Sequence, residues 1–284
     1  MVERELERRA LNAARAVASA HGLACDRAIV VYSGSNVLVH LLPAPVIARV
    51  MTGTVVLHDD PRRWLEREVA VLTFLAPSGL AVAPSPMIAA GPHEHDGLWM
   101  TLAEWLPDAE PGYPPVDAAR LGGALRELHD TLAPFDDDLA TFRDLRDDIV
   151  RLHGQLRPTQ QVDAQTIAGL RARLDDVGEV FDRPLPMQAL HGDASLSNLL
   201  RVSGRLVFND FEDTFRGPVQ WDVAGYASSL AQRGASPGFV REALDHYGWG
   251  DEAELAPFSA VHAVYDEIWR LYDRQRRQVG DVTR

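Results

Sequence analysis

A stretch rich in proline and glycine, PDAEPGYPP at residues 107–115, divides the chain into two parts of different character. Before it, β-branched and aromatic runs alternate with turn residues, and after it apolar residues recur mainly at helical spacing. A chain of 284 residues with 46% hydrophobic composition can bury a core in each part. We therefore expect an α+β protein with two lobes, residues 1–105 and residues 106–284.

The first part is predicted to form an antiparallel sheet with one inserted helix. The runs AIVVYSGSNVLVHLL and APVIARVMTG indicate three strands, and segments around PMIAA and LWMTLAEWL, which flank the turn GPHEHDG, indicate two more. Helical spacing of apolar residues predicts a helix over residues 3–20 ahead of the strands. Asp60 is suited to cap, and Pro61 to open, the inserted helix over residues 61–76. We expect a five-stranded antiparallel sheet in this lobe.

The second part is predicted to be mainly helical. Strand character interrupts the helical pattern only at residues 187–193 and 199–211, and Ser203-Gly204 splits the latter into a short hairpin. The predicted helices cover residues 116–132, 139–155, 161–182, 219–232, 237–247 and 252–278.

Charge and composition limit what the chain can bind. Its formal net charge of -13 argues against nucleic acid and anionic lipid, which need a concentrated positive field, and suits a cationic small molecule better. The chain contains no lysine, so its cationic side chains are arginines. Cys25 is the one cysteine, which excludes an internal disulfide. Without an apolar run of membrane-spanning length or a signal-peptide pattern, we expect a soluble cytoplasmic protein, and monomer and dimer both stay open.

Three oxygen-bearing side chains in the second part have the spacing of a phosphotransfer site. In HGDASLSNLL, Asp193 is followed five residues later by Asn198, and the next hairpin ends in FNDFED with Asp210. Kinase sites use an aspartate that orients the acceptor hydroxyl, and then an asparagine and a second aspartate that ligate Mg²⁺. Mg²⁺ prefers such hard oxygen ligands. The spacing thus indicates phosphate transfer from a nucleotide bound with Mg²⁺.

These motifs, with GPVQWDVAG and LRELHD in the same order, resemble the aminoglycoside phosphotransferase and choline kinase family. The resemblance covers nearly the whole chain and implies a protein-kinase-like two-lobed fold. It implies Asp193 as the catalytic base and Asn198 and Asp210 as the Mg²⁺ ligands. It also implies that Asp222 steadies the catalytic loop, which His191 is expected to shape. ATP or GTP would donate phosphate to a small-molecule hydroxyl, and antibiotic resistance and a metabolic role both stay open.

The first lobe is expected to bind the nucleotide. The turn YSGSN offers backbone amides and polar side chains to phosphate oxygens, at Ser33, Gly34, Ser35 and Asn36. The segment LAEWLPD falls where the family has its interlobe hinge. We therefore expect the Ala103 carbonyl and the Trp105 amide to contact adenine.

Kinases also place a cation on the third strand and hold it with a carboxylate from the inserted helix. Arg49 in VIARV is the only basic residue on that strand. At about 100° per residue, Glu68 lies within the apolar stripe of the helix, whereas Glu66 points away from it. We therefore expect Arg49 to pair with Glu68 and Glu66 to be solvated.

The acceptor is expected to bind on the helical lobe in front of Asp193. An amine-bearing acceptor such as an aminoglycoside, an aminosugar or an amino-alcohol would suit carboxylates beside aromatic rings. The segment VYDEIWRLYDR offers Asp266, Glu267, Trp269 and Asp273.

Two other functions stay open from the residues. A catalytically silent kinase-like nucleotide-binding protein would share the fold, although it predicts the loss of an active-site side chain that this chain keeps. A metal-dependent hydrolase would use His191, Asp193 and Asp210 as ligands, but it leaves Asn198 and the first lobe unexplained.

Other polar side chains are expected to be structural. His129 stands at a predicted helix end, where it would cap or pack. His93 and His95 lie on a polar turn without a third ligand, so we expect them to be exposed. Cys25 is expected to serve as a small apolar residue.

Overall fold

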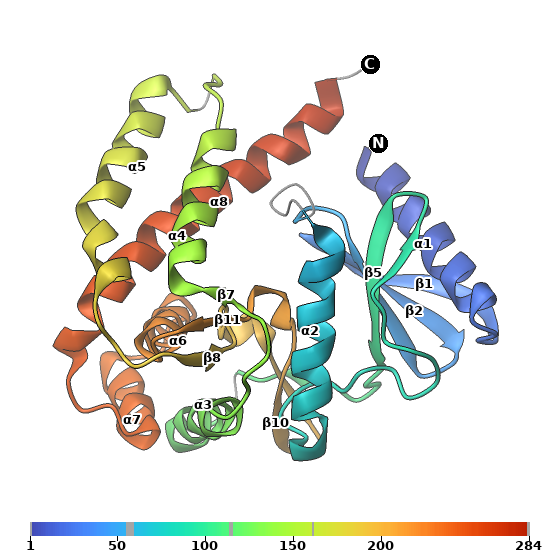
Figure 1. Cartoon of the computed structure of the whole chain (residues 1–284), viewed down its shortest axis with the longest axis horizontal. Coiled ribbons are helices and arrows are strands. Elements are labelled where there is room, and N and C mark those ends of the chain that lie inside the picture. Colours follow the sequence, from blue (N-terminus) through green and yellow to red (C-terminus); the bar gives the residue numbers. More distant parts are fainter. Residues whose placement is uncertain (1, 55–59, 114–115, 161, 283–284) are drawn as a thin grey trace. The chain divides into compact units, whose positions relative to one another are not determined.

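The computed structural model separates into two compact units (Figure 1). The first comprises Met1–Asp108 and Asp273–Arg284, and the second comprises Ala109–Tyr272. One helix, α8, Ala256–Val282, contributes to both units. The structure describes residues 2–54, 60–113, 116–160 and 162–282.

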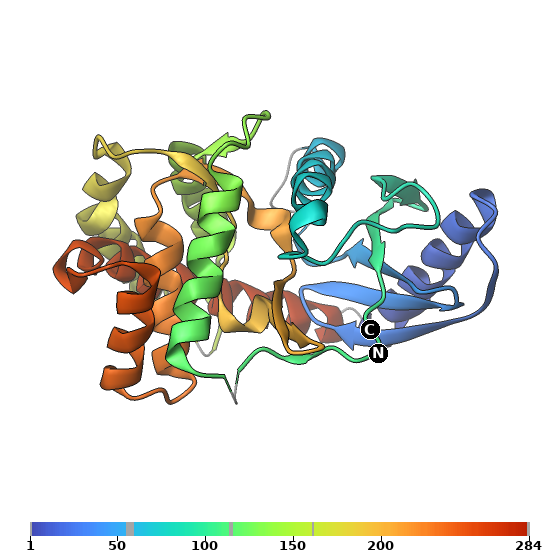
Figure 2. The same cartoon turned by 90° about the horizontal axis from the view of Figure 1, so that it is seen from below.

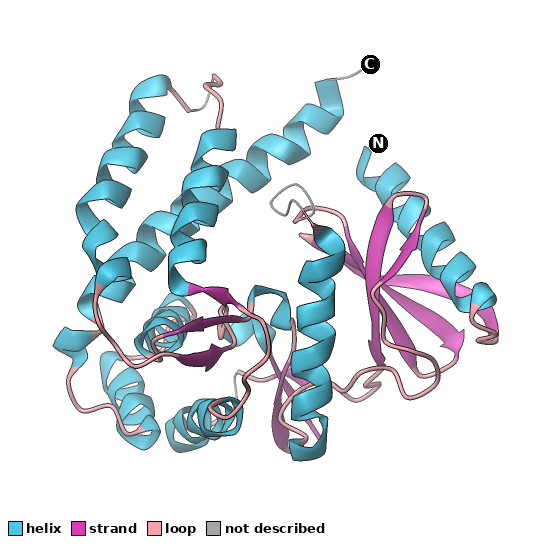
Figure 3. Cartoon of the chain, in the orientation of Figure 1, coloured by secondary structure: helices cyan, strands magenta, loops and turns pink. Residues whose placement is uncertain are grey.

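A five-stranded antiparallel sheet forms the first unit, which confirms the prediction (Figure 3). The strands lie in the order β1-β2-β3-β5-β4, and every neighbouring pair is antiparallel. Their bounds are Cys25–Ser33 for β1, Asn36–Pro43 for β2, Val46–Met51 for β3, His93–His95 for β4 and Leu98–Glu104 for β5.

The fourth strand lies elsewhere than predicted. It is β4, inside the segment GPHEHDG that was expected to be a turn, and the actual turn is Asp96-Gly97, where both residues have positive φ. The predicted strand at PMIAA does not form, and the segment before it makes one isolated bridge, between Pro84 and Ala103. Proline has no N–H for a β-ladder, so the prolines of APSPMIAA keep this segment irregular.

Helices cover the two faces of this sheet (Figures 1 and 2). Side chains alternate along a strand, so Ala48 and Val50 of β3 join the core under α1, Val2–Ala20, while Arg49 points to α2, Pro61–Leu75. The α2 helix begins where the sequence predicts, with the Asp60 side chain accepting a hydrogen bond from the Arg63 amide. The small residues of α1 in this core are Ala10, Ala13, Ala14 and Ala18.

The second unit is mainly helical, as predicted. Its helices start at capping side chains: Asp117, Thr141, Asp163 and Ser236 each accept a hydrogen bond from an amide in the first turn. No helix among the described residues is both long enough and apolar enough to cross a membrane. The bounds are Ala118–Leu132 for α3, Phe142–Gln155 for α4, Ala164–Val177 for α5, Gln220–Gln232 for α6 and Pro237–Tyr247 for α7.

Two small sheets lie among these helices. The strands β9, Leu199–Val202, and β10, Arg205–Phe208, form the predicted hairpin, and Ser203-Gly204 turns between them with positive φ at both residues. The linker contributes a short strand, β6, Glu110–Pro111, that pairs with β9. The other sheet has the order β7-β11-β8, with bounds Ala140–Thr141, Phe215–Gly217 and Gln188–Leu190.

Candidate active site

Asp193 and Asn198 lie together in the loop between β8 and β9. A short 3-10 turn, Leu196–Asn198, folds the loop back on itself. The Asn198 side-chain amide nitrogen then donates to the Asp193 carboxylate at 2.8 Å and to the Asp193 carbonyl at 2.9 Å. Asn198 is buried, whereas the Asp193 side chain is exposed to solvent. Because both bonds use the amide nitrogen, the Asn198 oxygen is directed away from Asp193.

Asp210 follows the β9–β10 hairpin and is tied to the same loop. The Asn209 amide donates to the Asn198 carbonyl at 2.9 Å, and Nε2 of His191 donates to the Asn209 carbonyl at 3.0 Å. Asp210 adopts φ 62° and ψ 64°, a left-handed conformation that is uncommon for residues other than glycine. The hairpin therefore places Asp210 close enough to Asp193 for its charge to raise the Asp193 pKa.

Asp222, in the first turn of α6, accepts hydrogen bonds from the backbone of this loop. Its Oδ2 accepts from the His191 amide at 2.9 Å, and its Oδ1 accepts from the Gly192 amide at 3.0 Å. The neighbouring Trp221 indole donates to the Gly192 carbonyl at 2.8 Å. Gly192 has φ 90°, and a Cβ there would lie 1.9 Å from the Asp213 carbonyl oxygen. Only glycine fits this position, which explains the middle residue of the His-Gly-Asp motif.

His191 is fully buried and its ring packs against aromatic side chains. Its centroid lies 4.3 Å from that of Phe211 and 5.8 Å from that of Phe208. Within the described chain, no group of three or more His, Cys, Asp or Glu side chains is arranged to hold a metal ion. The hydrolase alternative, which needs His191 as a ligand, therefore finds no support in the described residues. Asn198 and Asp210 remain candidate Mg²⁺ ligands, because a site that uses the amide oxygen of an asparagine is not among such groups.

The two aspartates of the loop have opposite pKa shifts. Desolvation works to raise the pKa of the fully buried Asp222, but the hydrogen bond and charge of His129 and the His191 amide outweigh it and hold that pKa below its ordinary value. The pKa of Asp193 is raised, by desolvation first and also by the Asp210 carboxylate, against the opposing effect of His191. Water reaches the Asp193 side chain, so desolvation is limited there and the Asp210 charge becomes the more important cause.

The glycine turn of the first unit is held from the end of β3. The Asn36 side-chain oxygen accepts from the Thr52 amide at 3.3 Å and from the Thr54 hydroxyl at 3.2 Å. The Ser35 carbonyl accepts from the Gly53 amide at 2.6 Å. Asn36, one of the residues expected to bind phosphate, is therefore buried and engaged within the protein. Ser33 ends β1, and Gly34 and Ser35 form the turn.

An arginine of α8 reaches the same turn. One guanidinium nitrogen of Arg276 donates to the Gly34 carbonyl at 3.3 Å, and Arg276 also pairs with Asp273 one helical turn earlier. A Cβ on Gly53 would lie 2.7 Å from the Arg276 guanidinium carbon. The sequence reading missed Arg276, because no local pattern links a C-terminal helix to a turn at the start of the chain.

Arg49 and Glu68 form the predicted ion pair. The Arg49 guanidinium lies 3.2 Å from Oε2 of Glu68, with side-chain exposures of 10% and 3%, so both charges are withdrawn from water. The Thr101 hydroxyl donates to the same oxygen at 3.3 Å. Glu66 instead pairs on the surface with Arg62. The helical periodicity had separated these two glutamates correctly.

The backbone groups expected to contact adenine are used within the sheet. The Trp105 amide donates to the Pro45 carbonyl at 2.9 Å, so it is not a free donor, which corrects the prediction. In an antiparallel pair of strands, every second residue forms hydrogen bonds to the partner strand. Ala103 lies two residues before Trp105 and opposite Ile47, so it is in such a hydrogen-bonded position. The Ala103 carbonyl therefore also faces β3. Register of this kind depends on the partner strand and has no local sequence signal.

The four residues expected to bind the acceptor are not gathered at one place. Glu267 pairs with Arg173 of α5 at 2.6 Å. Asp273 belongs to the first unit and pairs with Arg276. Trp269 packs against Tyr272, with ring centroids 5.8 Å apart. Asp266 acts electrostatically on His262 and Tyr265, two other residues of α8.

His262 and Tyr265 are α8 residues near the loop that the sequence reading overlooked. Nε2 of His262 donates to the Trp221 carbonyl at 3.0 Å, and the two rings are 3.8 Å apart. Burial lowers the pKa of His262, and burial together with the charges of Asp213 and Asp193 raises the pKa of Tyr265. His262, Tyr265 and Asp266 are spaced by three and four residues, which predicts that they share one face of a helix, and this was the signal that the sequence offered.

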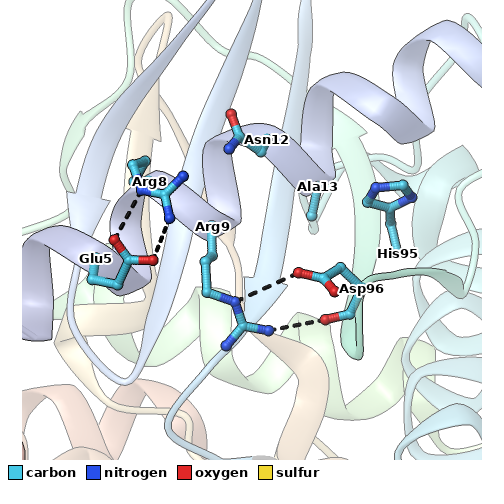
Figure 4. A pocket seen from close by; sticks show the side chains of 7 residues that line it. All are labelled: Glu5, Arg8, Arg9, Asn12, Ala13, His95 and Asp96. Carbon is cyan, nitrogen blue, oxygen red and sulfur yellow. Dashed lines mark hydrogen bonds and ion pairs between the residues drawn. The ribbon is translucent and has the colours of Figure 1, made fainter.

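The first unit also has a depression of about 620 Å³ (Figure 4). It runs between α1 and the β4–β5 turn, where His95 lies. Its arginines are already neutralised: Arg8 pairs with Glu5, and Arg9 bonds to the carbonyl and lies 3.7 Å from the carboxylate of Asp96. All four side chains are largely exposed. The depression therefore has no excess charge with which to select a ligand.

The match to a family model decides the family. The model described as the phosphotransferase enzyme family matches residues 32–258, which include both the glycine turn and the Asp193 loop. The chain belongs to this phosphotransferase family. No curated protein matches this phosphotransferase family member significantly.

Solved structures show the same fold at low sequence identity. Amicoumacin kinase hAmiN, in complex with AMP-PNP, Ca²⁺ and Ami, has a TM-score of 0.70 and 12% identity over 95% of this chain and 93% of its own. The GDP and kanamycin complex of APH(2")-IIia has a TM-score of 0.67 and 15% sequence identity, over 94% of this chain and 93% of its own. Choline kinase LicA from Streptococcus pneumoniae has a TM-score of 0.65 and 14% sequence identity, over 92% of this chain and 91% of its own. The kinase-like fold expected for this phosphotransferase is thereby confirmed.

Proposed function

We propose that this family member transfers the γ-phosphate of ATP or GTP to a hydroxyl group of a cationic small molecule. The observation that carries the proposal is the bonded arrangement of Asp193 and Asn198, with Asp210 in electrostatic range, at the spacing of a kinase site. The family match and the nucleotide complexes among proteins of similar fold support it.

Asp193 is proposed as the catalytic base. Its carboxylate is exposed, so an acceptor hydroxyl can reach it, and the Asn198 amide fixes its direction. It would accept or orient the hydroxyl proton while the oxygen attacks phosphorus in line with the leaving nucleoside diphosphate. Its raised pKa makes the carboxylate a better proton acceptor than that of an ordinary aspartate.

Asn198 and Asp210 are proposed to hold Mg²⁺. Their donor set, one amide oxygen and one carboxylate, suits a hard cation that keeps waters and phosphate oxygens in its remaining positions. The bond from the Asn198 nitrogen to Asp193 orients the amide so that its oxygen serves as the ligand atom. When bound, Mg²⁺ would neutralise the phosphate charge.

The first unit is proposed to bind the nucleotide. Arg49, oriented by Glu68, would bind phosphate oxygens where a lysine-containing kinase uses an ammonium, and its planar guanidinium can form two parallel hydrogen bonds. Because the Gly34 amide donates to the Asn36 carbonyl at 3.0 Å, the turn would add the Ser35 amide and the hydroxyls of Ser33 and Ser35. Since the Trp105 amide is engaged with Pro45, adenine contacts are proposed to come from the chain beyond Trp105.

The acceptor is proposed to be an amine-bearing molecule such as an aminoglycoside, an aminosugar or an amino-alcohol. Asp148, Asp193, Asp213 and Asp266 all act electrostatically on Tyr265, so negative charge gathers around this ring. A protonated amine lying against an aromatic ring among carboxylates is favourable. Two proteins of similar fold are a choline kinase and a complex with kanamycin, which supports this class.

The test starts from nucleotide binding. ATP or GTP with Mg²⁺ should raise the melting temperature of the wild type, and the Mg²⁺-dependent part of that shift should disappear in Asp210→Ala but persist in the surface control Asp96→Asn. Phosphate transfer is then screened against kanamycin, choline, ethanolamine and neutral sugars. Asp193→Ala should abolish transfer while it leaves nucleotide binding intact.

The outcomes separate the open functions. Nucleotide binding without turnover on any acceptor, and without slow hydrolysis that depends on Asp193, would favour the silent nucleotide-binding protein. Transfer to neutral sugars alone would overturn the cationic acceptor class. Because the pKa of Asp193 is raised, the rate should fall as the pH drops through a value above 3.8, the ordinary pKa of aspartate.

A further inference from the structure

A chain of buried hydrogen bonds continues behind Asp222, away from Asp193. Oδ2 of Asp222 also accepts from Nε2 of His129, at 3.1 Å, and Nδ1 of His129 lies 2.8 Å from the Tyr247 hydroxyl. His129 comes from the last turn of α3 and Tyr247 from the last turn of α7. His129 is 2% exposed, Asp222 1% and Tyr247 6%, so water does not compete for these bonds.

The direction of each bond follows from the groups involved. Asp222 is ionised and can only accept, so Nε2 of His129 carries a proton and donates it. In the tautomer that carries its proton on Nε2, Nδ1 accepts from the Tyr247 hydroxyl at 2.8 Å. Burial and the charge of Asp222 raise the pKa of Tyr247, which keeps the hydroxyl proton available to donate. The chain thus runs from Tyr247 through His129 to Asp222 with every donor matched to an acceptor.

The carboxylate of Asp222 is the point where this chain meets the active-site loop. It accepts three hydrogen bonds, one from His129 and two from the amides of His191 and Gly192. The bond from His129 shares Oδ2 with the bond from the His191 amide. A shift of the imidazole would therefore turn the carboxylate and move both amides, and Asp193 is the next residue after Gly192.

We propose that His129 and Tyr247 are positioning residues, which set the orientation of Asp193 by fixing the Asp222 carboxylate from behind. This inference rests on the proposed function for its catalytic consequence, but the hydrogen-bond relay itself does not. It gives α7 a part in catalysis, since Tyr247 transmits the position of that helix. It also replaces the expected capping or packing role of His129.

Close packing of α3 against α7 supports a rigid relay. A Cβ on Gly122 of α3 would lie 1.9 Å from the Ala243 carbonyl oxygen of α7, so only glycine allows the two backbones to approach this closely. The Arg126 guanidinium donates to the Tyr247 carbonyl at 3.2 Å and lies over the Tyr247 ring, 5.9 Å from its centre. Both ends of the bond between His129 and Tyr247 are therefore held by their backbones.

Tyr226 offers a matched control. It is also a buried tyrosine, 2% exposed, and its hydroxyl donates to the Leu121 carbonyl of α3 at 3.2 Å rather than to His129. Tyr247→Phe and Tyr226→Phe therefore remove the same atom from similar surroundings. At His129, a glutamine can place its amide nitrogen near the position of Nε2 and keep the bond to Asp222, whereas an asparagine reaches only the position of Nδ1.

The experiment measures kcat and KM for hydrolysis of ATP with Mg²⁺, and for transfer once an acceptor is found. Losing a hydrogen bond to a charged group should lower kcat by roughly tenfold or more in His129→Asn, and Tyr247→Phe should lower it by about threefold, with KM for ATP unchanged. His129→Gln should recover most of the loss. Tyr226→Phe should lower stability as much as Tyr247→Phe but leave kcat at the wild-type value.

A second readout, hydrogen exchange of the His191 and Gly192 amides, does not depend on activity. These amides should exchange several-fold faster in Tyr247→Phe than in Tyr226→Phe. If the wild type shows no turnover, the proposed function fails and this exchange comparison alone decides the relay. Equal exchange and equal kcat in the two tyrosine variants would overturn the relay, even if His129→Asn failed to fold.

Discussion

Glu68 and Asp222 are both buried carboxylates that hold a functional element, but they are stabilised in different ways. Glu68, in the sheet unit, faces the guanidinium of Arg49, a formal opposite charge. Asp222, in the helical unit, accepts hydrogen bonds from two backbone amides and an imidazole. The comparison shows that a buried negative charge can be balanced either by one cation or by several oriented dipoles.

The difference has a functional consequence. Arg49 is a side chain that can reach beyond its pair, so Glu68 holds a group that is proposed to bind phosphate. Asp222 binds the backbone itself, so it defines where the loop runs rather than what a neighbouring side chain does. The two carboxylates should therefore respond differently to substitution of their partners.

The largest expected effect is the loss of one member of the ion pair. Arg49→Met should destabilise the first unit by about 3–5 kcal/mol, because it leaves the Glu68 carboxylate buried without that guanidinium. The double variant Arg49→Met/Glu68→Leu should recover most of this loss, although not nucleotide binding. Denaturant unfolding followed by circular dichroism measures both. Arg62→Met, which breaks a surface pair on the same helix, is the control, and equal losses in the two methionine variants would contradict the buried-pair interpretation.

The second effect concerns Asp222→Asn, which should cost about 2–3 kcal/mol in the free energy of unfolding. Asparagine offers one acceptor oxygen and presents an N–H₂ group to donors. Here a second substitution should not restore stability: the double variant Asp222→Asn/His129→Phe still leaves the amides of His191 and Gly192 short of an acceptor. Recovery to the wild-type free energy in the same unfolding measurement would show that Asp222 behaves like Glu68 after all.

A third, smaller effect is the pH dependence of the Asp222 contribution. The pKa of Asp222 in the folded protein lies below its ordinary value of 3.8, so its contribution is fully present above pH 3.8 and is lost as the pH falls from there through the folded-state pKa. The difference in unfolding free energy between wild type and Asp222→Asn should narrow in that range, at about 1.4 kcal/mol per unit of pKa lowering. Unfolding measured from pH 7 to pH 3 tests this, and a constant difference would contradict it.

The smallest effect is expected where charges are exposed to solvent. Arg9→Ala removes the contacts with Asp96 beside the depression in Figure 4 and should change the unfolding free energy by no more than about 0.5 kcal/mol. Added salt should erase even this difference, because exposed charges are screened. A loss comparable to that of Arg49→Met would show that this surface pair is not ordinary.

Local patterns predicted much of the fold and part of the site. The start of α2 followed from Asp60 and Pro61, and the contact between Arg49 and Glu68 followed from strand alternation and helical periodicity. The hairpin before Asp210 followed from Ser203-Gly204. Each of these features depends on residues near one another in sequence or on a fixed repeat.

Other features depend on contacts that no local pattern encodes. Tyr247 lies 118 residues from His129, and Arg276 lies 242 residues from Gly34, so only the tertiary fold brings them together. The engagement of the Trp105 amide depends on the register between β3 and β5. The fourth strand had a local signal in the turn residues Asp96-Gly97, whereas the apolar run PMIAA, with prolines at 84 and 86, predicted a strand that does not form.

The left-handed backbone of Asp210 bears on how this enzyme family loses activity over generations. Glycine occupies that conformation without strain, and asparagine more readily than most residues, so either substitution would remove the carboxylate that is proposed to ligate Mg²⁺ while it suits the left-handed backbone. Once selection for turnover relaxes, the backbone conformation at this position would favour these two substitutions over others. Silent descendants of such a chain would then be expected to keep their architecture and to carry glycine or asparagine here.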